Sequence, residues 1–218
     1  MAGVTLVKVC GITRADDARL AAQLGAWALG FVLAESPRRV DPPHAAQLIA
    51  AARTPHAVVV VTTEPAGWIA GALAESGADV VQLSAGADGP TVTQVREAAA
   101  GLERRPLVIA AAGTPDAHLA DYVLLDARTG EAYGGTGRTL DWEALAADPA
   151  APAGNVVLAG GLRPDNVGAA IAALHPTAVD VSSGVESKPG VKDHRQVRDF
   201  FTAVVQADGG AALRRTAG

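Results

Sequence analysis

The stretch LVKVCGITRADDARLAAQLGAWALGFVL, residues 6–33, contains two short apolar runs with an alanine-rich segment between them. The runs at 6–12 and 27–33 are almost continuously hydrophobic, which is typical of strands that are covered on both faces of a parallel sheet. In the segment DDARLAAQLG at 16–25, apolar residues recur at helical spacing and a glycine ends the pattern. The stretch therefore predicts one strand–helix–strand unit of a parallel sheet.

The same pattern continues along the rest of the chain. Further apolar runs lie at 57–62, 79–84, 106–112, 122–127, 156–161 and 178–184, with alanine-rich segments of helical spacing between them. Eight strand–helix units of roughly 25 residues each fill the chain, which predicts an α/β fold with a single closed (β/α)8 barrel, the TIM barrel. A doubly wound open sheet is the alternative, but that architecture usually has fewer strands.

The chain is expected to form one domain, because no long linker divides it and 218 residues suit one barrel. We expect the barrel to occupy residues 1–206. The tail ADGGAALRRTAG at 207–218 has few apolar side chains to bury, so we expect it to fray.

Composition limits the classes of partner and the compartment. The net charge is −5 without a long run of one sign, which is unlike the basic face of a nucleic-acid-binding protein. The one cysteine cannot form an intrachain disulfide, and the chain shows neither a secretory leader nor an apolar run of the ~20 residues that span a bilayer. We therefore expect a cytoplasmic protein, monomer or homodimer, that binds small molecules rather than nucleic acid or membrane.

Active sites of such barrels lie at the carboxyl ends of the strands, which reduces the candidate residues to a short group. Cys10 follows the first strand and Asp126 follows the sixth, on the far side of the barrel mouth. Two proton-transfer groups that face each other across a substrate are what an isomerisation needs. The alternative is structural, because a lone cysteine is more often a buried apolar side chain and an aspartate often caps a loop. Three further polar residues at strand ends are candidates for substrate binding: Arg38, Ser84 and Asp180.

The ends of the last two strands predict a phosphate site. Glycines expose backbone N–H groups there, and the loops after the seventh and eighth strands of this fold frequently bind phosphate. The alternative is that these residues only allow tight turns. The residues concerned are Gly160, Gly161, Ser182, Ser183 and Gly184.

Two other kinds of site find little support. The segment GGTGRT at 134–139 lacks the Gly-Lys-Ser/Thr ending of a nucleotide loop, so we interpret it as a mobile cover of the active site. No cluster of histidine, cysteine or carboxylate residues has metal-ligand spacing, so we expect no metal and no organic cofactor.

Six segments of the chain, in order, resemble the phosphoribosylanthranilate isomerase family of tryptophan biosynthesis. They are VKVCGIT at 7–13, GFVLAESPRRV at 30–40, VVQLS at 80–84, LLDARTGEAYGGTGRTLDW at 124–142, LAGGLRPDNV at 158–167 and VDVSSGVESKPGVKDH at 179–194. The resemblance covers nearly the whole chain and implies the same barrel. It also implies an Amadori rearrangement, in which N-(5′-phosphoribosyl)anthranilate becomes 1-(2-carboxyphenylamino)-1-deoxyribulose 5-phosphate.

The resemblance assigns roles to three residues. Asp126 corresponds to the family's general acid, which protonates the ribose ring oxygen, and Cys10 to the general base, which removes the C2′ proton. Arg38 corresponds to the arginine that meets the anthranilate carboxylate, a partner that suits a planar guanidinium. Its neighbour Arg39 stands where the family more often has tyrosine.

One departure from the family pattern lies at the end of the fourth strand. The family usually has Gln-Leu-His-Gly there, whereas this chain has Gln82, Leu83, Ser84 and Ala85. We expect the reaction to survive this change with an altered rate or substrate affinity. The end of the third strand, VVVVTTE, also differs from the usual Val-Phe-Val-Asn pattern.

Two other functions remain as alternatives. One is a related isomerase with a shifted substrate, such as the aminoaldose of histidine biosynthesis. That aminoaldose carries two phosphates, and a binding site for one phosphate argues against it. The other is a barrel that binds a phosphometabolite without catalysis. The presence of Cys10, Asp126 and Arg38 at three separate strand ends weighs against it.

Overall fold

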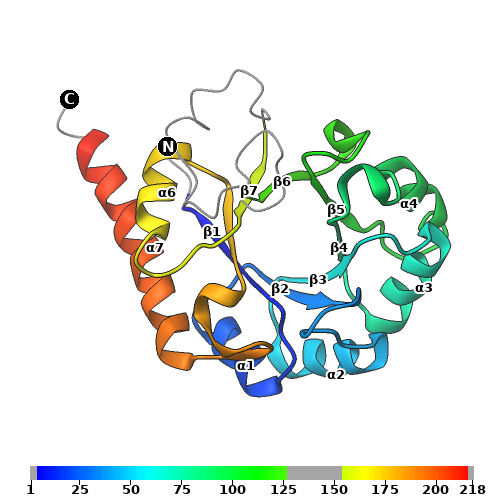
Figure 1. The fold of residues 1–218 in the computed structure, drawn as a ribbon, viewed down its shortest axis with the longest axis horizontal. Helices are drawn as coiled ribbons and strands as arrows, with labels where there is room; N and C mark the ends of the chain where they lie inside the picture. The colour runs from blue at the N-terminus through cyan, green and yellow to red at the C-terminus, as the bar shows by residue number, and fades with distance from the viewer. Residues whose placement is uncertain (1–3, 127–153, 216–218) are drawn as a thin grey trace.

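The computed structural model describes residues 4–126 and 154–215, with side chains as far as residue 209. Eight parallel strands pair in chain order, and β8 pairs with β1, so that the barrel closes as expected (Figure 1). The strands are β1 (Leu6–Cys10), β2 (Ala28–Val32), β3 (His56–Val61), β4 (Val80–Leu83), β5 (Leu107–Ala111), β6 (Tyr122–Asp126), β7 (Val156–Ala159) and β8 (Ala178–Val181).

Helices surround the barrel on its outside (Figure 1). They are α1 (Ala15–Gln23), α2 (Pro42–Ala52), α3 (Ala66–Ser76), α4 (Val92–Ala98), α6 (Val167–Leu174) and α7 (His194–Arg215). Local sequence explains several of their ends. Asp41 caps α2 by accepting a hydrogen bond from His44 N, and the chain leaves α3 through Gly77 in the left-handed conformation.

Side chains of successive strand residues point alternately into the barrel and toward the helices. The buried residues accordingly form two apolar clusters, a large one between strands and helices and a small one inside the barrel. The register of β1 places Lys8 beside Ala28 and Asp180, and Cys10 beside Gly30. Lys8, Cys10 and Asp180 therefore share the barrel interior.

The connection between β5 and β6 differs from the expected strand–helix unit. It contains only the short 3-10 helix η2 (Ala117–Leu119) instead of an α-helix. Residues 112–121 are too few for a full helical crossover, which usually needs at least about a dozen residues including its helix, and Gly113 and Pro115 interrupt the pattern.

The C-terminal helix also continues further than we expected. We expected residues from 207 onward to fray, but α7 extends to Arg215. Asp208 accepts hydrogen bonds from Thr5 N at 2.8 Å and from Thr5 Oγ1 at 2.7 Å. This contact joins the helix to the segment that leads into β1, a partnership that the local composition of the tail does not reveal.

A small hairpin lies between β8 and α7. After the 3-10 turn η3 (Ser183–Val185), strands β9 (Glu186–Lys188) and β10 (Val191–Lys192) pair in antiparallel fashion. Among the helices that the structure describes, none has the length and apolarity to cross a bilayer.

Candidate active site

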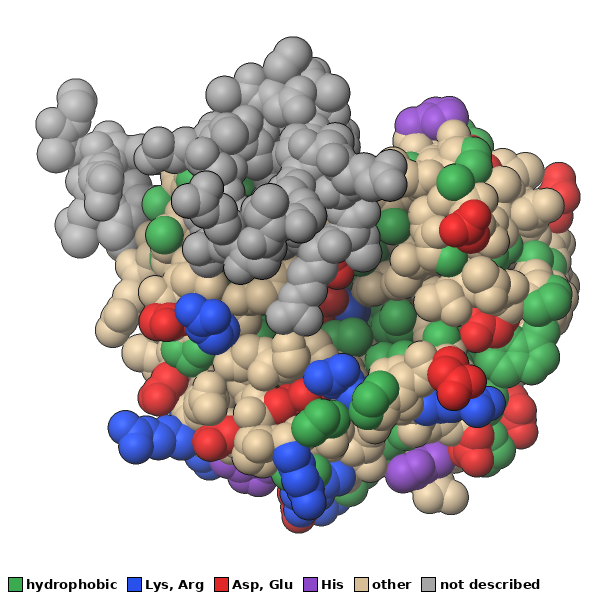
Figure 2. All heavy atoms as spheres, in the orientation of Figure 1, with side chains coloured by type: hydrophobic (Ala, Val, Ile, Leu, Met, Phe, Trp, Pro, Cys, Tyr) green, Lys and Arg blue, Asp and Glu red, His purple; other side chains and the backbone are tan. Residues whose placement is uncertain are grey.

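A cavity of about 160 Å³ opens at the carboxyl ends of the strands. Figure 2 shows the molecule hollowed near its middle, with apolar and charged side chains on the walls of the hollow. Nine of the ten residues predicted for the site line this cavity, and Arg38 does not. The nine are Cys10, Ser84, Asp126, Gly160, Gly161, Asp180, Ser182, Ser183 and Gly184.

The thiol of Cys10 lies inside the barrel at the last residue of β1, 8% exposed. A Cβ atom at Gly30 would lie 2.8 Å from Cys10 Sγ, so the glycine on β2 leaves the room that the sulfur occupies. Burial raises the pKa of the Cys10 thiol, and the positive charge of Lys8 partly opposes this. The thiol packs among apolar residues, as a structural cysteine would, and it also lines the cavity, as a proton-transfer group would.

Asp126 ends β6 and lines the same cavity as Cys10. In the closed ring, β7 and β8 separate β6 from β1 on one side, and four strands separate them on the other. The two proposed proton-transfer groups thus come from non-adjacent strands and meet one enclosed space.

A fully buried lysine, which sequence reasoning missed, lies just below the thiol. Lys8 Nζ donates to Asp180 Oδ2 at 2.7 Å inside the barrel. Burial lowers the pKa of Lys8, but the Asp180 carboxylate outweighs this effect and leaves the pKa above its usual value. The charge in the otherwise apolar run LVKVC could have revealed this residue, because an unpaired ammonium is not tolerated at an interior position.

Two oxygens in the cavity wall are buried without a hydrogen-bond partner among the described residues: Asp180 Oδ1 and Gln82 Oε1. Ser84 Oγ accepts a hydrogen bond from Gln82 Nε2 at 3.0 Å. The serine therefore fixes the amide of Gln82 and turns its oxygen away from Ser84. Buried acceptors are normally paired, so two unpaired ones beside a cavity indicate places for donors of a ligand.

The loops after β7 and β8 approach each other closely at the edge of the cavity. A Cβ atom at Gly184 would lie 1.8 Å from the carbonyl oxygen of Leu162, so only glycine fits there. Gly160 and Gly161 have φ values of 95° and 71°, which place the chain after β7 in the left-handed region. The two glycine-containing loops thus bring their backbones to one small area.

Arg38, in the loop after β2, is bound to a carboxylate of the chain itself. Its Nε donates to Glu186 Oε1 at 2.8 Å and its Nη2 donates to Glu186 Oε2 at 2.7 Å. The stem of Arg38 crosses Gly11, because a Cβ atom at Gly11 would lie 2.5 Å from Arg38 Cδ. Arg39 is exposed, so of the two arginines only Arg38 is held beside the end of β1.

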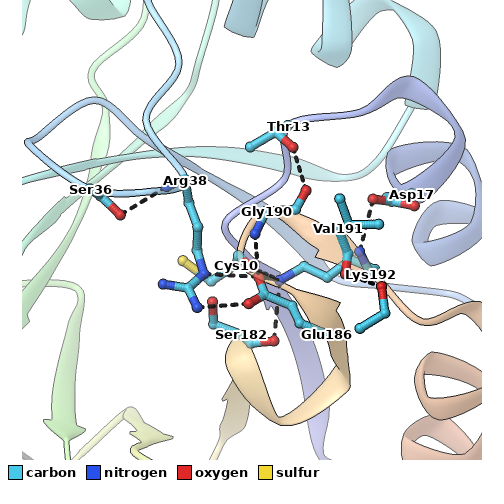
Figure 3. A network of polar contacts seen from close by, with 11 residues as sticks. Cys10, Thr13, Asp17, Ser36, Arg38, Ser182, Glu186, Gly190, Val191 and Lys192 are labelled. Atoms are coloured by element: carbon cyan, nitrogen blue, oxygen red, sulfur yellow. Dashed lines mark hydrogen bonds and ion pairs between the residues drawn. The ribbon is translucent and has the colours of Figure 1, made fainter.

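Lys192 on β10 extends this group of charges. Its Nζ donates to Glu186 Oε1 at 2.8 Å, to the Cys10 carbonyl at 2.6 Å and to the Ser182 carbonyl at 3.2 Å (Figure 3). Hydrogen bonds from Arg38 and Lys192 outweigh the effect of burial on Glu186, whose pKa lies below its usual value. The sequence shows these charges in VESKPGVKDH but does not show which partners they meet.

Among the described residues, no three His, Cys, Asp or Glu side chains are grouped so that they could hold a metal ion. The segment GGTGRT, interpreted as a mobile cover, lies outside the described residues.

Comparison with known proteins places these features in a family context. A family model described as "N-(5'phosphoribosyl)anthranilate (PRA) isomerase" matches residues 7–203. The N-(5'-phosphoribosyl)anthranilate isomerase of Pelobacter propionicus is 42% identical to this chain over 207 residues, which cover 89% of this chain and 93% of the relative.

Solved structures give a similar result. The crystal structure of TrpF from Jonesia denitrificans matches with a TM-score of 0.76 and 38% identity, covering 94% of this chain and 98% of that one. A phosphoribosyl anthranilate isomerase in complex with reduced 1-(o-carboxyphenylamino)-1-deoxyribulose 5-phosphate matches with a TM-score of 0.71 and 29% identity, covering 93% and 99%.

Proposed function

The chain belongs to the N-(5′-phosphoribosyl)anthranilate isomerase family, and we propose that Cys10 and Asp126 are the base and the acid of its reaction. The enzyme converts N-(5′-phosphoribosyl)anthranilate into 1-(2-carboxyphenylamino)-1-deoxyribulose 5-phosphate, a step of tryptophan biosynthesis. The observation that carries the assignment of roles is the single cavity that Cys10, Asp126 and the two glycine-containing loops share.

The reaction begins with ring opening. Asp126 gives its proton to the ring oxygen of the ribose, the bond from that oxygen to C1′ breaks, and the lone pair of the anthranilate nitrogen forms a C1′=N double bond. General acid catalysis of such a step contributes about 10²- to 10⁴-fold in rate. The position of Asp126 supports this role, because the residue lines the cavity at the end of β6.

The second step moves the double bond. The Cys10 thiolate removes the C2′ proton, the electron pair forms a C1′=C2′ bond, and the nitrogen regains its lone pair. The enolamine then becomes the ketone when the C2′ hydroxyl loses its proton and C1′ gains one. Asp126, now a carboxylate, takes part in these later proton transfers.

The base must be a thiolate, and the surroundings of Cys10 affect this state in opposite directions. Burial raises the pKa of the thiol, which favours the neutral form. The ammonium of Lys8 and the iminium ion of the opened substrate both favour the charged form. Lys8 therefore acts on catalysis through Cys10.

Other groups at the cavity hold the rest of the substrate. The backbone N–H groups of Gly160, Gly161, Ser183 and Gly184, with Ser182, bind the phosphate. Asp180 Oδ1 and Gln82 Oε1, whose hydrogen-bonding capacity is unused among the described residues, accept hydrogen bonds from the substrate, and Ser84 orients Gln82. Arg38 binds the anthranilate carboxylate.

We also propose that this enzyme is located in the cytoplasm.

Turnover of two substrates by purified protein tests this proposal. We expect loss of the fluorescence of phosphoribosylanthranilate, and little conversion of the doubly phosphorylated aminoaldose of histidine biosynthesis in a parallel assay. Growth of a tryptophan auxotroph that lacks this step would show the same activity in cells. A protein that binds phosphoribosylanthranilate without converting it would contradict the catalytic roles and favour a binding function.

A further inference from the structure

Glu186 lies at the centre of a group of charges that joins three separate parts of the barrel mouth. Figure 3 shows Arg38 from the loop after β2 and Lys192 from β10 converging on this carboxylate, while Lys192 also donates to the Cys10 carbonyl at the end of β1. The Glu186 side chain is only 4% exposed, although it carries a charge. Four donors surround its two oxygens: Nε and Nη2 of Arg38, Nζ of Lys192 and the backbone N of Gly190.

The geometry of the Arg38–Glu186 pair leaves part of the guanidinium available. A guanidinium offers five N–H donors in a planar arrangement, with one pair of parallel donors along its Nε–Nη2 edge and another along its Nη1–Nη2 edge. Glu186 occupies the Nε–Nη2 edge. Among the described residues, Nη1 makes no hydrogen bond, and the side chain is 22% exposed, so the second edge can receive another carboxylate.

The charges of the three side chains do not balance. Arg38 and Lys192 carry two positive charges against the one negative charge of Glu186. The group therefore has a net charge of one positive unit, which one carboxylate on a ligand would neutralise. Without Lys192, Glu186 would neutralise Arg38 and weaken its attraction for a second anion.

Glu186 is itself held firmly. Lys192 Nζ uses its three protons on Glu186 Oε1 and on the carbonyls of Cys10 and Ser182, which end β1 and follow β8. The stem of Arg38 crosses Gly11, and Arg38 N donates to Ser36 Oγ at 3.1 Å. The guanidinium is thus constrained at its backbone, along its stem and along one edge.

We propose that Glu186 is a positioning residue for substrate recognition, which fixes Arg38 so that its free edge meets the anthranilate carboxylate. This inference rests on the proposed role of Arg38. Glu186 binds the guanidinium before substrate arrives, so less freedom is lost when the carboxylate binds. Lys192 supports this arrangement by anchoring Glu186 to the backbone and by leaving the positive charge in excess.

Binding of two ligands to the same variants tests this inference. The first ligand is reduced 1-(o-carboxyphenylamino)-1-deoxyribulose 5-phosphate, and the second is its phenylamino counterpart without the carboxyl group. The dissociation constant of the second ligand divided by that of the first, both measured by calorimetry, reports recognition of the carboxylate alone. We expect Glu186→Gln to reduce this ratio about tenfold, while affinity for the second ligand stays nearly unchanged.

Controls separate this inference from the role of Arg38. Arg38→Met must abolish the preference for the carboxylate, and Glu35→Gln, at an exposed position of the same loop, must leave it intact. If Arg38→Met keeps the preference, the role of Arg38 fails and this inference fails with it. If Arg38→Met abolishes it but Glu186→Gln leaves or increases it, only the positioning role is refuted.

A second variant covers the case in which Glu186→Gln does not fold. Glu186→Asp keeps the charge beside Lys192 but shortens the side chain by one methylene group. We expect a partial loss of the carboxylate preference, smaller than for Glu186→Gln. An unchanged ratio in Glu186→Asp, or an equal loss of affinity for both ligands, would refute the positioning role.

Discussion

The two ends of the barrel interior have opposite chemistry. At the carboxyl ends of the strands, Cys10, Gln82 and Asp126 line a cavity. At the amino ends, Trp27 packs against Tyr122 and His56 with ring centroids 5.1 and 5.4 Å apart, and Leu6 and Leu107 lie against the same cluster. One end therefore places polar groups at a cavity, and the other end fills its space with large side chains.

Lys8 and Asp180 mark the boundary between the two ends. Their ion pair lies one interior layer below Cys10, and each partner belongs to a different strand. A buried ion pair contributes little to stability on its own, because removing two charges from water costs about as much as their attraction returns. Its position beneath the thiol is better explained by function than by packing.

The largest effects should follow from changes at the cavity end. Cys10→Ser and Asp126→Asn each remove one proton-transfer group, so we expect kcat to fall by about 10³-fold or more in steady-state assays with phosphoribosylanthranilate. Because both changes nearly conserve side-chain volume, the thermal midpoint should change little. Asp88→Asn, an exposed acid in the turn after β4, is the matched control and should keep full activity. Full activity in either of the first two variants would remove that residue from the mechanism.

The next largest effect concerns stability at the opposite end. Trp27→Ala removes a side chain that is 91% buried, and we expect the free energy of unfolding to fall by about 3 to 5 kcal/mol. The kcat of the protein that remains folded should be nearly normal. Denaturant titration measures this difference, with Trp68→Ala as the control, because Trp68 is 42% exposed on α3. An equal loss of unfolding free energy in the two variants would contradict the stabilising role of the amino end of the barrel.

A variant at the boundary should affect the pH dependence of the reaction. Lys8→Met removes the positive charge that lowers the pKa of Cys10, so that pKa rises further and less thiolate exists at neutral pH. We expect kcat/KM at neutral pH to fall roughly tenfold and to recover as pH rises.

The thiolate can be followed directly in this variant by its ultraviolet absorbance, because Cys10 is the only cysteine of the chain. Lys8→Met combined with Asp180→Asn avoids an unpaired buried carboxylate, and Lys188→Met is a control at an exposed position. Because the Asp180 carboxylate raises the pKa of Cys10, the combined variant is compared with Asp180→Asn alone. Equal thiol titrations in these two variants would show that Lys8 has no influence on the base.

The smallest effect should come from the fourth strand. Ser84→Ala removes the acceptor for Gln82 Nε2, which allows the amide to turn, and we expect KM to rise about threefold with kcat nearly unchanged. Steady-state kinetics with Ser187→Ala as an exposed control measures this difference. A fall in kcat without a change in KM would mean that Ser84 contacts the reacting atoms instead of orienting Gln82.

Much of this architecture could be predicted because it depends on local pattern. Near-continuous apolar runs indicate strands covered on both faces, and all eight predicted strands are present. The rule that sites lie at strand ends then led to Cys10, Asp126 and the glycine-containing loops without knowledge of any contact. The prediction of an α-helix after β5 was wrong, because that connection is too short for an α-helix.

What the sequence by itself determined is the order of strands and helices and the chemistry present at each strand end, since both follow from short-range periodicity. Only the tertiary structure decided which charges meet. Lys8 and Asp180 lie 172 positions apart, and Arg38 and Glu186 lie 148 positions apart. Their pairing depends on barrel closure and on the path of the β9–β10 hairpin, and local pattern contains no information about the partners that such long-range contacts bring together.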